Sequence, residues 1–221
     1  ASAVGVQEII EPELFAREAK ARLGPSWRFT ASSSITKQRV GVLWDSNVWT
    51  MVEQHEHREP AVRRGAKPAL EVVLQPKGDG RPSARLHMMV IHLKSGGSHV
   101  ETRRSQITAL RPILDERIRQ QTRLVLLGDF NSTGEDDRQM LAKLSRELGM
   151  DWASQHVTCT SYWQRNDGCL STALDHMLTW TPAHHVRVGG ACAEMGCETG
   201  ESCPRYREDV SDHCPLVATF R

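Results

Sequence analysis

The stretch Leu124-Val125-Leu126-Leu127-Gly128-Asp129-Phe130-Asn131 decides how this chain is expected to fold. Its first four residues form a continuous apolar run, which is typical of a β-strand that is covered on both faces. Asp129 and Asn131 follow two positions apart, so their side chains share a face if the segment is extended. The pattern therefore predicts a buried strand that presents a carboxylate and an amide at its end. An Asx-turn at the strand end is the alternative.

Regular elements are expected on both sides of this strand. Pro12 and Gly24 mark the start and end of one helix, and apolar residues at helical spacing mark a second, which Pro112 is expected to bend. A Lys77-Gly78-Asp79-Gly80 turn joins two strands into a hairpin. No repeat or linker interrupts the 221 residues, so we expect a single domain over 1–221. Expected strands are 4–6, 27–30, 39–44, 48–52, 69–74, 85–93, 173–180, 185–188 and 216–220, and expected helices are 12–23, 101–121 and 135–148.

The composition leaves the class of partner open. Lys and Arg total 28 against 27 for Asp and Glu, a formal net charge of +1. A nucleic-acid enzyme needs a local basic groove rather than a basic whole. No apolar run approaches the roughly 18–20 residues of a membrane span. No signal peptide is recognised, and the start at Ala1 is that expected of a mature or trimmed protein.

Six cysteines all lie in the last third of the chain. An even, clustered set favours disulfides in an oxidising compartment, and hence a secreted or periplasmic protein. Short spacings favour the pairs Cys159–Cys169 and Cys197–Cys203, which leaves Cys192–Cys214, although other connectivities are open. A zinc site formed by Cys192, Cys197, Cys203 and Cys214 is a rival, but its spacings are looser than usual. Free buried thiols are a third alternative.

Four further tracts place polar residues beside apolar runs: Gln7-Glu8, His92-Leu93-Lys94-Ser95, Leu174-Asp175-His176 and Ser211-Asp212-His213-Cys214-Pro215. A phosphodiester is an anion, so it repels nucleophiles, and its leaving oxygen gains negative charge as the bond breaks. A hard divalent cation reduces the repulsion and stabilises the leaving oxygen. Mg²⁺ prefers oxygen ligands and usually takes one or two carboxylates. These tracts therefore suit the attack of a metal-assisted water on a phosphodiester.

Each polar residue has a candidate role in that chemistry. Glu8 is the best candidate metal ligand, although a surface glutamate before a helix is the plainer reading. Asp129 would orient the water or touch the metal, and Asn131 would donate to a phosphate oxygen. His213 is the candidate general base, or the group that holds the nucleophilic water. Asp212 would lie beside the metal or the water.

The order Gln-Glu, His-Leu-Lys-Ser, Gly-Asp-Phe-Asn, Leu-Asp-His and Ser-Asp-His resembles the endonuclease/exonuclease/phosphatase superfamily, from Val4 to Phe220. The resemblance implies an α+β, four-layer DNase-I-like fold, with two packed mixed β-sheets flanked by helices. It also implies an additional first strand ending in an Asn, which is missing from the seven residues before Glu8. Either the sequence is trimmed, or a core strand and one site residue are absent.

The resemblance also implies roles for two residues outside the Gly-Asp-Phe-Asn tract. Asp175 would orient His213, as the acid orients the imidazole in a catalytic triad. His92 matches a histidine of the DNase-I and sphingomyelinase branches, which contacts phosphate or protonates the leaving oxygen. It argues against the abasic-site endonuclease branch. A strand-end histidine with a purely structural partner is the alternative.

Basic and aromatic residues suggest substrate contacts. Lys94 would add positive charge near the phosphate, with a solvated lysine as its equal rival. Arg39 and Arg58 resemble basic positions of bacterial family members, and could form a groove that tracks a nucleic-acid backbone. A solvated charged loop is as good an account. Tyr162-Trp163 would stack on a base or sugar, or pack beneath a loop.

Three functions compete at this point. The leading one is a secreted or periplasmic, monomeric, Mg²⁺-dependent nuclease that acts on DNA, with Mn²⁺ or Ca²⁺ as alternative cations. The second is a phospholipid or phosphoinositide phosphodiesterase or phosphatase, which the polar loops 58–68, 77–82 and 95–99 disfavour. The third is a non-catalytic binding module, which the nearly complete set of site residues disfavours.

Overall fold

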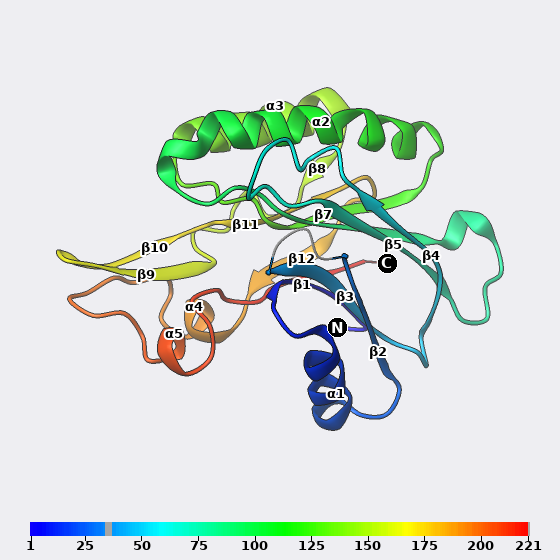
Figure 1. Ribbon diagram of the computed structural model, residues 1–221, viewed down its shortest axis with the longest axis horizontal. Coiled ribbons are helices and arrows are strands. Elements are labelled where there is room, and N and C mark those ends of the chain that lie inside the picture. Colours follow the sequence, from blue (N-terminus) through cyan, green and yellow to red (C-terminus); the bar gives the residue numbers. More distant parts are fainter. Residues whose placement is uncertain (34–36, 221) are drawn as a thin grey trace.

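The computed structural model describes residues 1–33 and 37–220, arranged in four layers (Figure 1). A three-stranded sheet and a six-stranded sheet form the two inner layers. The three-stranded sheet has the order β1 (Ala3–Ile9), β3 (Arg39–Asp45), β2 (Trp27–Ala31). The six-stranded sheet has the order β4 (Trp49–His57), β5 (Ala69–Pro76), β6 (Leu86–His92), β7 (Arg123–Asp129), β11 (Asp175–Thr179), β8 (Asp151–Trp152).

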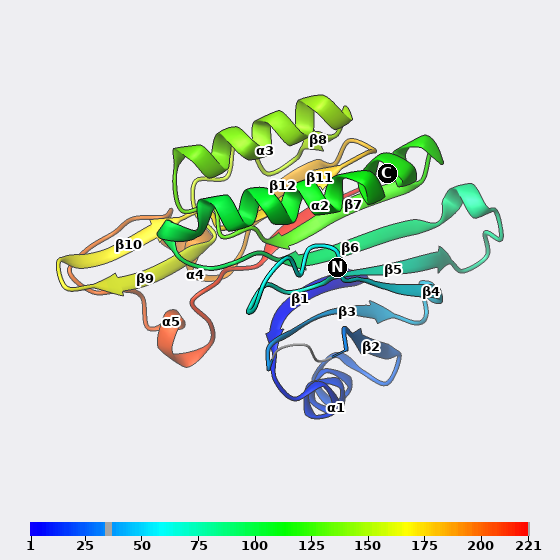
Figure 2. The ribbon, with the colours of Figure 1, turned by 45° about the horizontal axis from the view of Figure 1, so that its top comes forward.

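Helices form the two outer layers. Helices α2 (Val100–Arg119) and α3 (Glu135–Leu148) lie side by side over the six-stranded sheet, and α1 (Pro12–Leu23) lies on the opposite side of the molecule (Figure 2). Phe15 of α1 contacts Phe29 of β2, with ring centroids 4.9 Å apart. The α+β, four-layer DNase-I-like architecture expected from the sequence is therefore confirmed.

Two hydrophobic cores hold the layers together. Leu110 and Leu114 of α2 pack with Leu126 of β7 between the helices and the six-stranded sheet, and all three are fully buried. Val42 of β3 packs with Val72 of β5 between the two sheets. Because β7 is covered on both faces, its sequence contains a continuous apolar run rather than an alternating pattern. Strand β5 is buried in the same way, but Glu71 interrupts its apolar residues.

A smaller unit projects from one end of the sheets (Figure 1). It contains a third, disulfide-lined core, with Tyr162 buried among the cysteines. Its elements are β9 (Ser161–Arg165), β10 (Gly168–Thr172), α4 (Gly190–Glu194) and α5 (Tyr206–Asp209). The strands β12 (His184–Val188) and β13 (Leu216–Thr219) form a separate pair in the body of the molecule, and short 3₁₀ turns lie at Pro82–Ala84 and Gly97–His99.

The disulfides correct two of the three expected pairings. The bonds join Cys159 to Cys197, Cys169 to Cys203 and, as expected, Cys192 to Cys214. In the β9–β10 hairpin Cys169 lies opposite Gln164. Gln164 lies five positions after Cys159, which is about 16 Å at the rise of a strand and too far for a disulfide. All six cysteines are bonded, so neither the zinc site nor the free thiols form.

Most expected elements are present, with shifted ends. The hairpin of β5 and β6 and the three long helices match, and α2 continues beyond Pro112 to Arg119. The strand expected at 48–52 continues to His57, because β4 is an edge strand whose polar residues show no hydrophobic alternation. The β9–β10 hairpin was not expected. No helix within 1–33 and 37–220 is long and apolar enough to cross a membrane.

Candidate active site

The ends of three neighbouring strands bring the first polar residues together. Strands β6 and β7 run parallel, and their register places His92 beside Asp129. Strand β11 runs antiparallel to β7 on its other side and places Asp175 beside Asp129. Gly128 allows this close packing, because a side chain there would collide with the backbone carbonyl of Ile91. Asp129 is thus flanked by an imidazole and a second carboxylate.

Asp175 and His213 form a hydrogen-bonded pair, the arrangement predicted for them. Nδ1 of His213 donates to Oδ2 of Asp175 at 2.7 Å. The hydroxyl of Thr160 donates to the same oxygen at 2.7 Å and accepts the backbone N–H of Asp175 at 2.9 Å. Backbone pairing of Ser161 with His213 carries the C-terminal segment to this point. The imidazole is therefore held at its Nδ1 edge by a buried carboxylate, which leaves Nε2 for substrate or water.

The pKa of His213 reflects this environment. Burial lowers the pKa, but the hydrogen bond and charge of Asp175, with the charges of Asp129 and Asp212, outweigh burial and raise it to about 9. His213 is therefore an imidazolium at neutral pH in the free protein. A group in that state donates hydrogen bonds and holds water, and it does not accept a proton.

Asn131 holds Asp129. Its backbone N–H donates to Oδ1 of Asp129 at 2.7 Å, and its Nδ2 donates to Oδ2 at 2.8 Å and to the carbonyl of Leu93 at 3.1 Å. This is the Asx-turn that the sequence left open, with Asn131 in the left-handed region at φ 50°. While both Nδ2 hydrogens are engaged in this way, Asn131 cannot also donate to a phosphate oxygen.

Asp129 and His92 both depart from their ordinary protonation behaviour. Burial and the negative charge of Asp175, with a smaller contribution from Glu8, raise the pKa of Asp129 although His213 opposes them. Burial and the nearby cations Lys67, His213 and Lys94 lower the pKa of His92 to about 3. Nε2 of His92 lies 3.3 Å from Oδ2 of Asp129. His92 is thus a neutral imidazole, suited to hydrogen bonding with phosphate rather than to protonating a leaving group.

Glu8 and Asp212 are the exposed carboxylates of the site. Glu8 lies at a bulge of β1, with φ 61°, and its Oε1 is 3.9 Å from Nε2 of His92. Both residues line a cavity of about 670 Å³, together with Asp129, Asp175 and His213. The site therefore joins the end of β1 in one sheet to the strand ends of the other.

A hard divalent cation fits this donor set. The described part of the chain holds no cluster of three or more His, Cys, Asp or Glu residues placed to bind a metal. Mg²⁺ needs only one or two carboxylates and otherwise keeps its waters. Exposed Glu8 offers one such ligand, and exposed Asp212 and buried Asp129 present further carboxylates to the same cavity.

Lys67 lies beside the candidate site, although the sequence placed it only within the polar loop 58–68. Its Nζ lies 3.4 Å from Nε2 of His92, and burial lowers its pKa against the charges of Glu8 and Asp129. Lys94, a predicted substrate contact, approaches the same loop. Its Nζ lies 3.9 Å from the point that a Cβ atom would occupy if Gly65 carried a side chain. Only the position of Lys67 directly before Pro68 and a buried strand could have drawn attention to it.

The remaining predicted contacts are Arg39, Arg58 and the pair Tyr162-Trp163. Arg39 begins β3 opposite Ile9, the residue after Glu8, so it borders the site. Arg58 is exposed and donates to Glu56 at 3.1 Å and Ser33 at 3.3 Å. Tyr162 is buried and Trp163 is 46% exposed, so packing accounts for the first, and stacking remains open for the second.

A four-layer α+β sandwich with polar residues at its central strand ends is the DNase-I-like fold, and the solved structures agree. D. rerio TDP2 in complex with a single-strand DNA product matches with a TM-score of 0.69 at 14% identity, covering 100% of this chain and 86% of that one. The 3′ phosphatase NExo from Neisseria matches with a TM-score of 0.69 at 17% identity, covering 100% and 89%.

The human Nocturnin catalytic domain is a third solved structure with this fold. It matches with a TM-score of 0.64 at 17% identity, covering 99% of this chain and 81% of that one. No protein-family model and no curated protein matches the sequence. At such low identities the likeness establishes the fold.

Proposed function

We propose that this chain is a divalent-metal-dependent phosphodiester hydrolase that cleaves nucleic acid, with DNA as the favoured substrate. The observation that carries the proposal is the His213–Asp175 pair beside Asp129 at the strand ends. His213, an oriented imidazolium, is a hydrogen-bond donor, and Asp129, a buried carboxylate with a raised pKa, is a proton acceptor. Hydrolysis by water uses an acceptor for the proton of the attacking water, and a hydrogen-bond donor stabilises the charge that develops on the phosphoryl oxygens.

The roles of the proposed site residues follow from their protonation and exposure. Asp129 accepts a proton from the attacking water, whose oxygen bonds to phosphorus as the bond between phosphorus and the leaving oxygen breaks. Asn131 holds the carboxylate of Asp129 in place. His213 donates from Nε2 to the water or to a phosphate oxygen, and Asp175 keeps the ring oriented. Neutral His92 hydrogen-bonds the phosphate.

Glu8 and Asp212 would hold the cation, with Mg²⁺ favoured and Mn²⁺ or Ca²⁺ as alternatives. A bound divalent cation supplies stabilisation of the charge on the phosphoryl and leaving oxygens. Lys67 and Lys94 add positive charge on the side of His92, and Arg39 and Arg58 extend it toward a polyanionic substrate.

Two further observations support the substrate class and location. The similarly folded TDP2 and NExo structures contain a single-strand DNA product and a product DNA hairpin. Three disulfides favour an oxidising compartment, so we propose a secreted or periplasmic enzyme.

Cleavage of supercoiled plasmid DNA in Mg²⁺ tests the proposal. We expect nicking that is lost with EDTA, in Glu8→Ala and in His213→Ala, while the exposed control Glu13→Ala keeps it. Metal-dependent nicking that persists in His213→Ala would remove His213 from the mechanism. Hydrolysis of phospholipid vesicles without cleavage of DNA would show that the substrate of this site is a lipid.

A further inference from the structure

Arg103, in the first turns of α2, is a fully buried arginine whose N–H groups are all used. Nε and Nη2 donate to the carboxylate of Asp137 in α3 at 2.8 and 2.7 Å. Nη1 donates to the carbonyls of Lys94 at 3.0 Å and Gly96 at 2.8 Å, and Nη2 donates to Thr133 Oγ1 at 3.2 Å. Arg103 and Asp137 are 0% and 2% exposed. Complete pairing of this kind offsets the cost of burying a charge.

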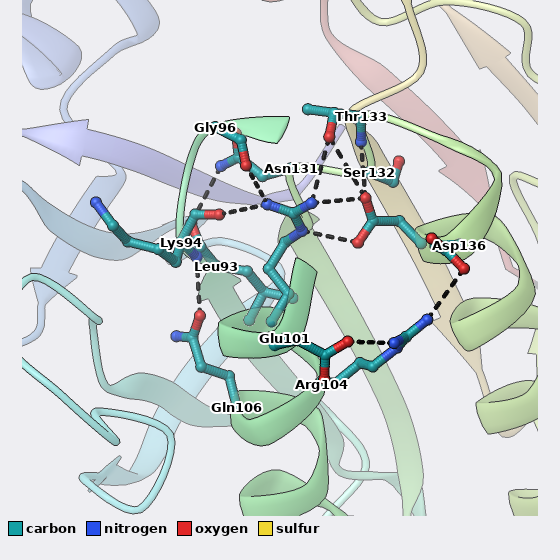
Figure 3. A network of polar contacts seen from close by, with 12 residues as sticks. Leu93, Lys94, Gly96, Glu101, Arg104, Gln106, Asn131, Ser132, Thr133 and Asp136 are labelled. Carbon is teal, nitrogen blue, oxygen red and sulfur yellow. Dashed lines mark hydrogen bonds and ion pairs between the residues drawn. The ribbon is translucent and has the colours of Figure 1, made fainter. Parts of the chain in front are cut away.

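The partners of Arg103 belong to two loops that leave the candidate active site. One loop follows His92 at the end of β6 and contains Lys94 and Gly96. The other follows Asp129 at the end of β7 and contains Asn131 and Thr133. Figure 3 shows Lys94 and Gly96 on one side of the network and Thr133 on the other.

Other contacts connect the same two loops. Nδ2 of Asn131 donates to the carbonyl of Leu93, and the backbone N–H of Lys94 donates to Gln106 of α2 at 2.8 Å. The backbone N–H of Thr133 donates to Asp137 at 3.1 Å. Gly96 has a φ of 100°, a conformation that favours glycine, where its carbonyl meets Arg103. The loops are thus linked near the site by Asn131 and further from it by Arg103.

We infer that Arg103 is a positioning residue that sets the loop carrying Lys94 and the loop carrying Asn131 at a fixed distance from each other. A planar guanidinium can bond two loops and a carboxylate at once, whereas a lysine ammonium cannot. The inference deepens the proposed function and rests on it, because the two loops carry groups assigned to phosphate and to Asp129.

Arg103→Lys tests this assignment, because it retains the charge opposite Asp137 but not the bridge. Arg104→Gln is a matched control: Arg104 is the next residue of α2, and it also bonds an α3 carboxylate, Asp136, at 3.1 Å. Its other acceptor is Glu101 of its own helix, so it contacts neither loop. Figure 3 shows this neighbouring pair as well. Asp137→Asn is a second variant that keeps the shape of the site.

Two measurements are made on folded protein, each well below the melting temperature. The first is the hydrogen exchange of the Lys94 and Thr133 amides. We expect faster exchange of both amides in Arg103→Lys and Asp137→Asn, and unchanged exchange in Arg104→Gln. The second is hydrolysis of bis-p-nitrophenyl phosphate in Mg²⁺. We expect kcat to fall about tenfold or more in Arg103→Lys with a smaller change in KM, since small displacements of aligned groups reduce rates steeply.

The inference is overturned if exchange rises in only one loop or in neither, or if kcat of folded Arg103→Lys stays within about twofold of an active wild type. If the wild type hydrolyses neither DNA nor the small phosphodiester, the proposed function fails, and the exchange rates alone decide whether Arg103 couples the loops. A role in stability alone predicts a lower melting temperature in Arg103→Lys with unchanged kcat, and this too overturns the inference.

Discussion

Nδ1 of His213 donates to Oδ2 of Asp175 at 2.7 Å, although the two residues lie 38 positions apart. The pair forms because backbone pairing places His213 opposite Ser161, next to the Thr160 hydroxyl that also bonds Asp175. The charge of Asp175 sustains the raised pKa of His213 against burial. The pair thus connects the C-terminal segment, which carries His213, to the six-stranded sheet, which carries Asp175.

Replacing Asp175 with Asn tests the orientation of His213. The amide can still accept from Thr160, but it no longer stabilises the imidazolium. We expect kcat for plasmid nicking to fall about 10²–10⁴-fold, as for the acid of a catalytic triad. Asp151→Asn, an exposed carboxylate in β8, is the control and should keep full activity. A reduction smaller than about tenfold would indicate that Asp175 does not act through His213.

Replacing Lys67 with Met tests whether its charge serves the substrate. Because Nζ lies 3.4 Å from His92 and near Glu8 and Asp129, its loss should weaken binding of a polyanion. We expect KM for DNA to rise, and the slope of log KM against log salt to fall by about 1. Lys77→Met, in the β5–β6 turn, should leave that slope unchanged. An unaltered slope in Lys67→Met would assign this lysine a structural role.

Glu71 provides a prediction about stability. This fully buried carboxylate accepts from His57 and His87 at 2.8 Å and from Arg117 at 2.7 Å. Burial raises its pKa, but the hydrogen bonds of the two histidines and of Arg117 outweigh burial and hold the pKa far below its ordinary value of 4.5. Glu71→Gln should therefore lower the free energy of unfolding at pH 7 by about 3–5 kcal/mol, because it removes the buried carboxylate that Arg117 contacts most closely.

The pH dependence of this loss has a defined sign. A depressed folded-state pKa stabilises the protein above the unfolded-state pKa and loses that effect as pH falls toward the folded-state value. The difference between wild type and Glu71→Gln should thus shrink below pH 4.5, by about 1.4 kcal/mol per unit. Urea unfolding at several pH values measures it, with exposed Glu147→Gln as the control. A pH-independent difference would contradict the prediction.

The disulfide pairing can be checked directly. Non-reducing peptide mapping should recover peptides that link Cys159 to Cys197 and Cys169 to Cys203. A peptide linking Cys159 to Cys169 by a disulfide would contradict the structure. The double variant Cys159→Ser, Cys197→Ser should lose about 3 kcal/mol of stability. With Cys169–Cys203 intact, the bond closes a short loop through that second disulfide, 10 positions from Cys159 to Cys169 and 6 from Cys197 to Cys203.

Several parts of the fold and site were predictable from local sequence. The apolar run before Asp129 identified a strand covered on both faces, and β7 is such a strand. The pairing of Asp175 with His213 also followed, but from a resemblance of motifs rather than from spacing. Glu71 lies within the expected strand 69–74, and nothing in the sequence marked it as a buried charge. Nothing near Glu71 in the sequence indicates that His57, His87 and Arg117 converge on it.

The sequence by itself determined the three long helices, most strands of the two large sheets and the kinds of group that stand at the strand ends, because helix and strand periods are properties of neighbouring residues. The tertiary structure decided what depends on sheet register and strand order. The β9–β10 register separated Cys159 from Cys169, and the approach of a basic loop brought Lys67 to His92. The packing of α2 against α3 placed Arg103 between two loops. Such contacts join segments whose separation in the sequence carries no information about their distance in space.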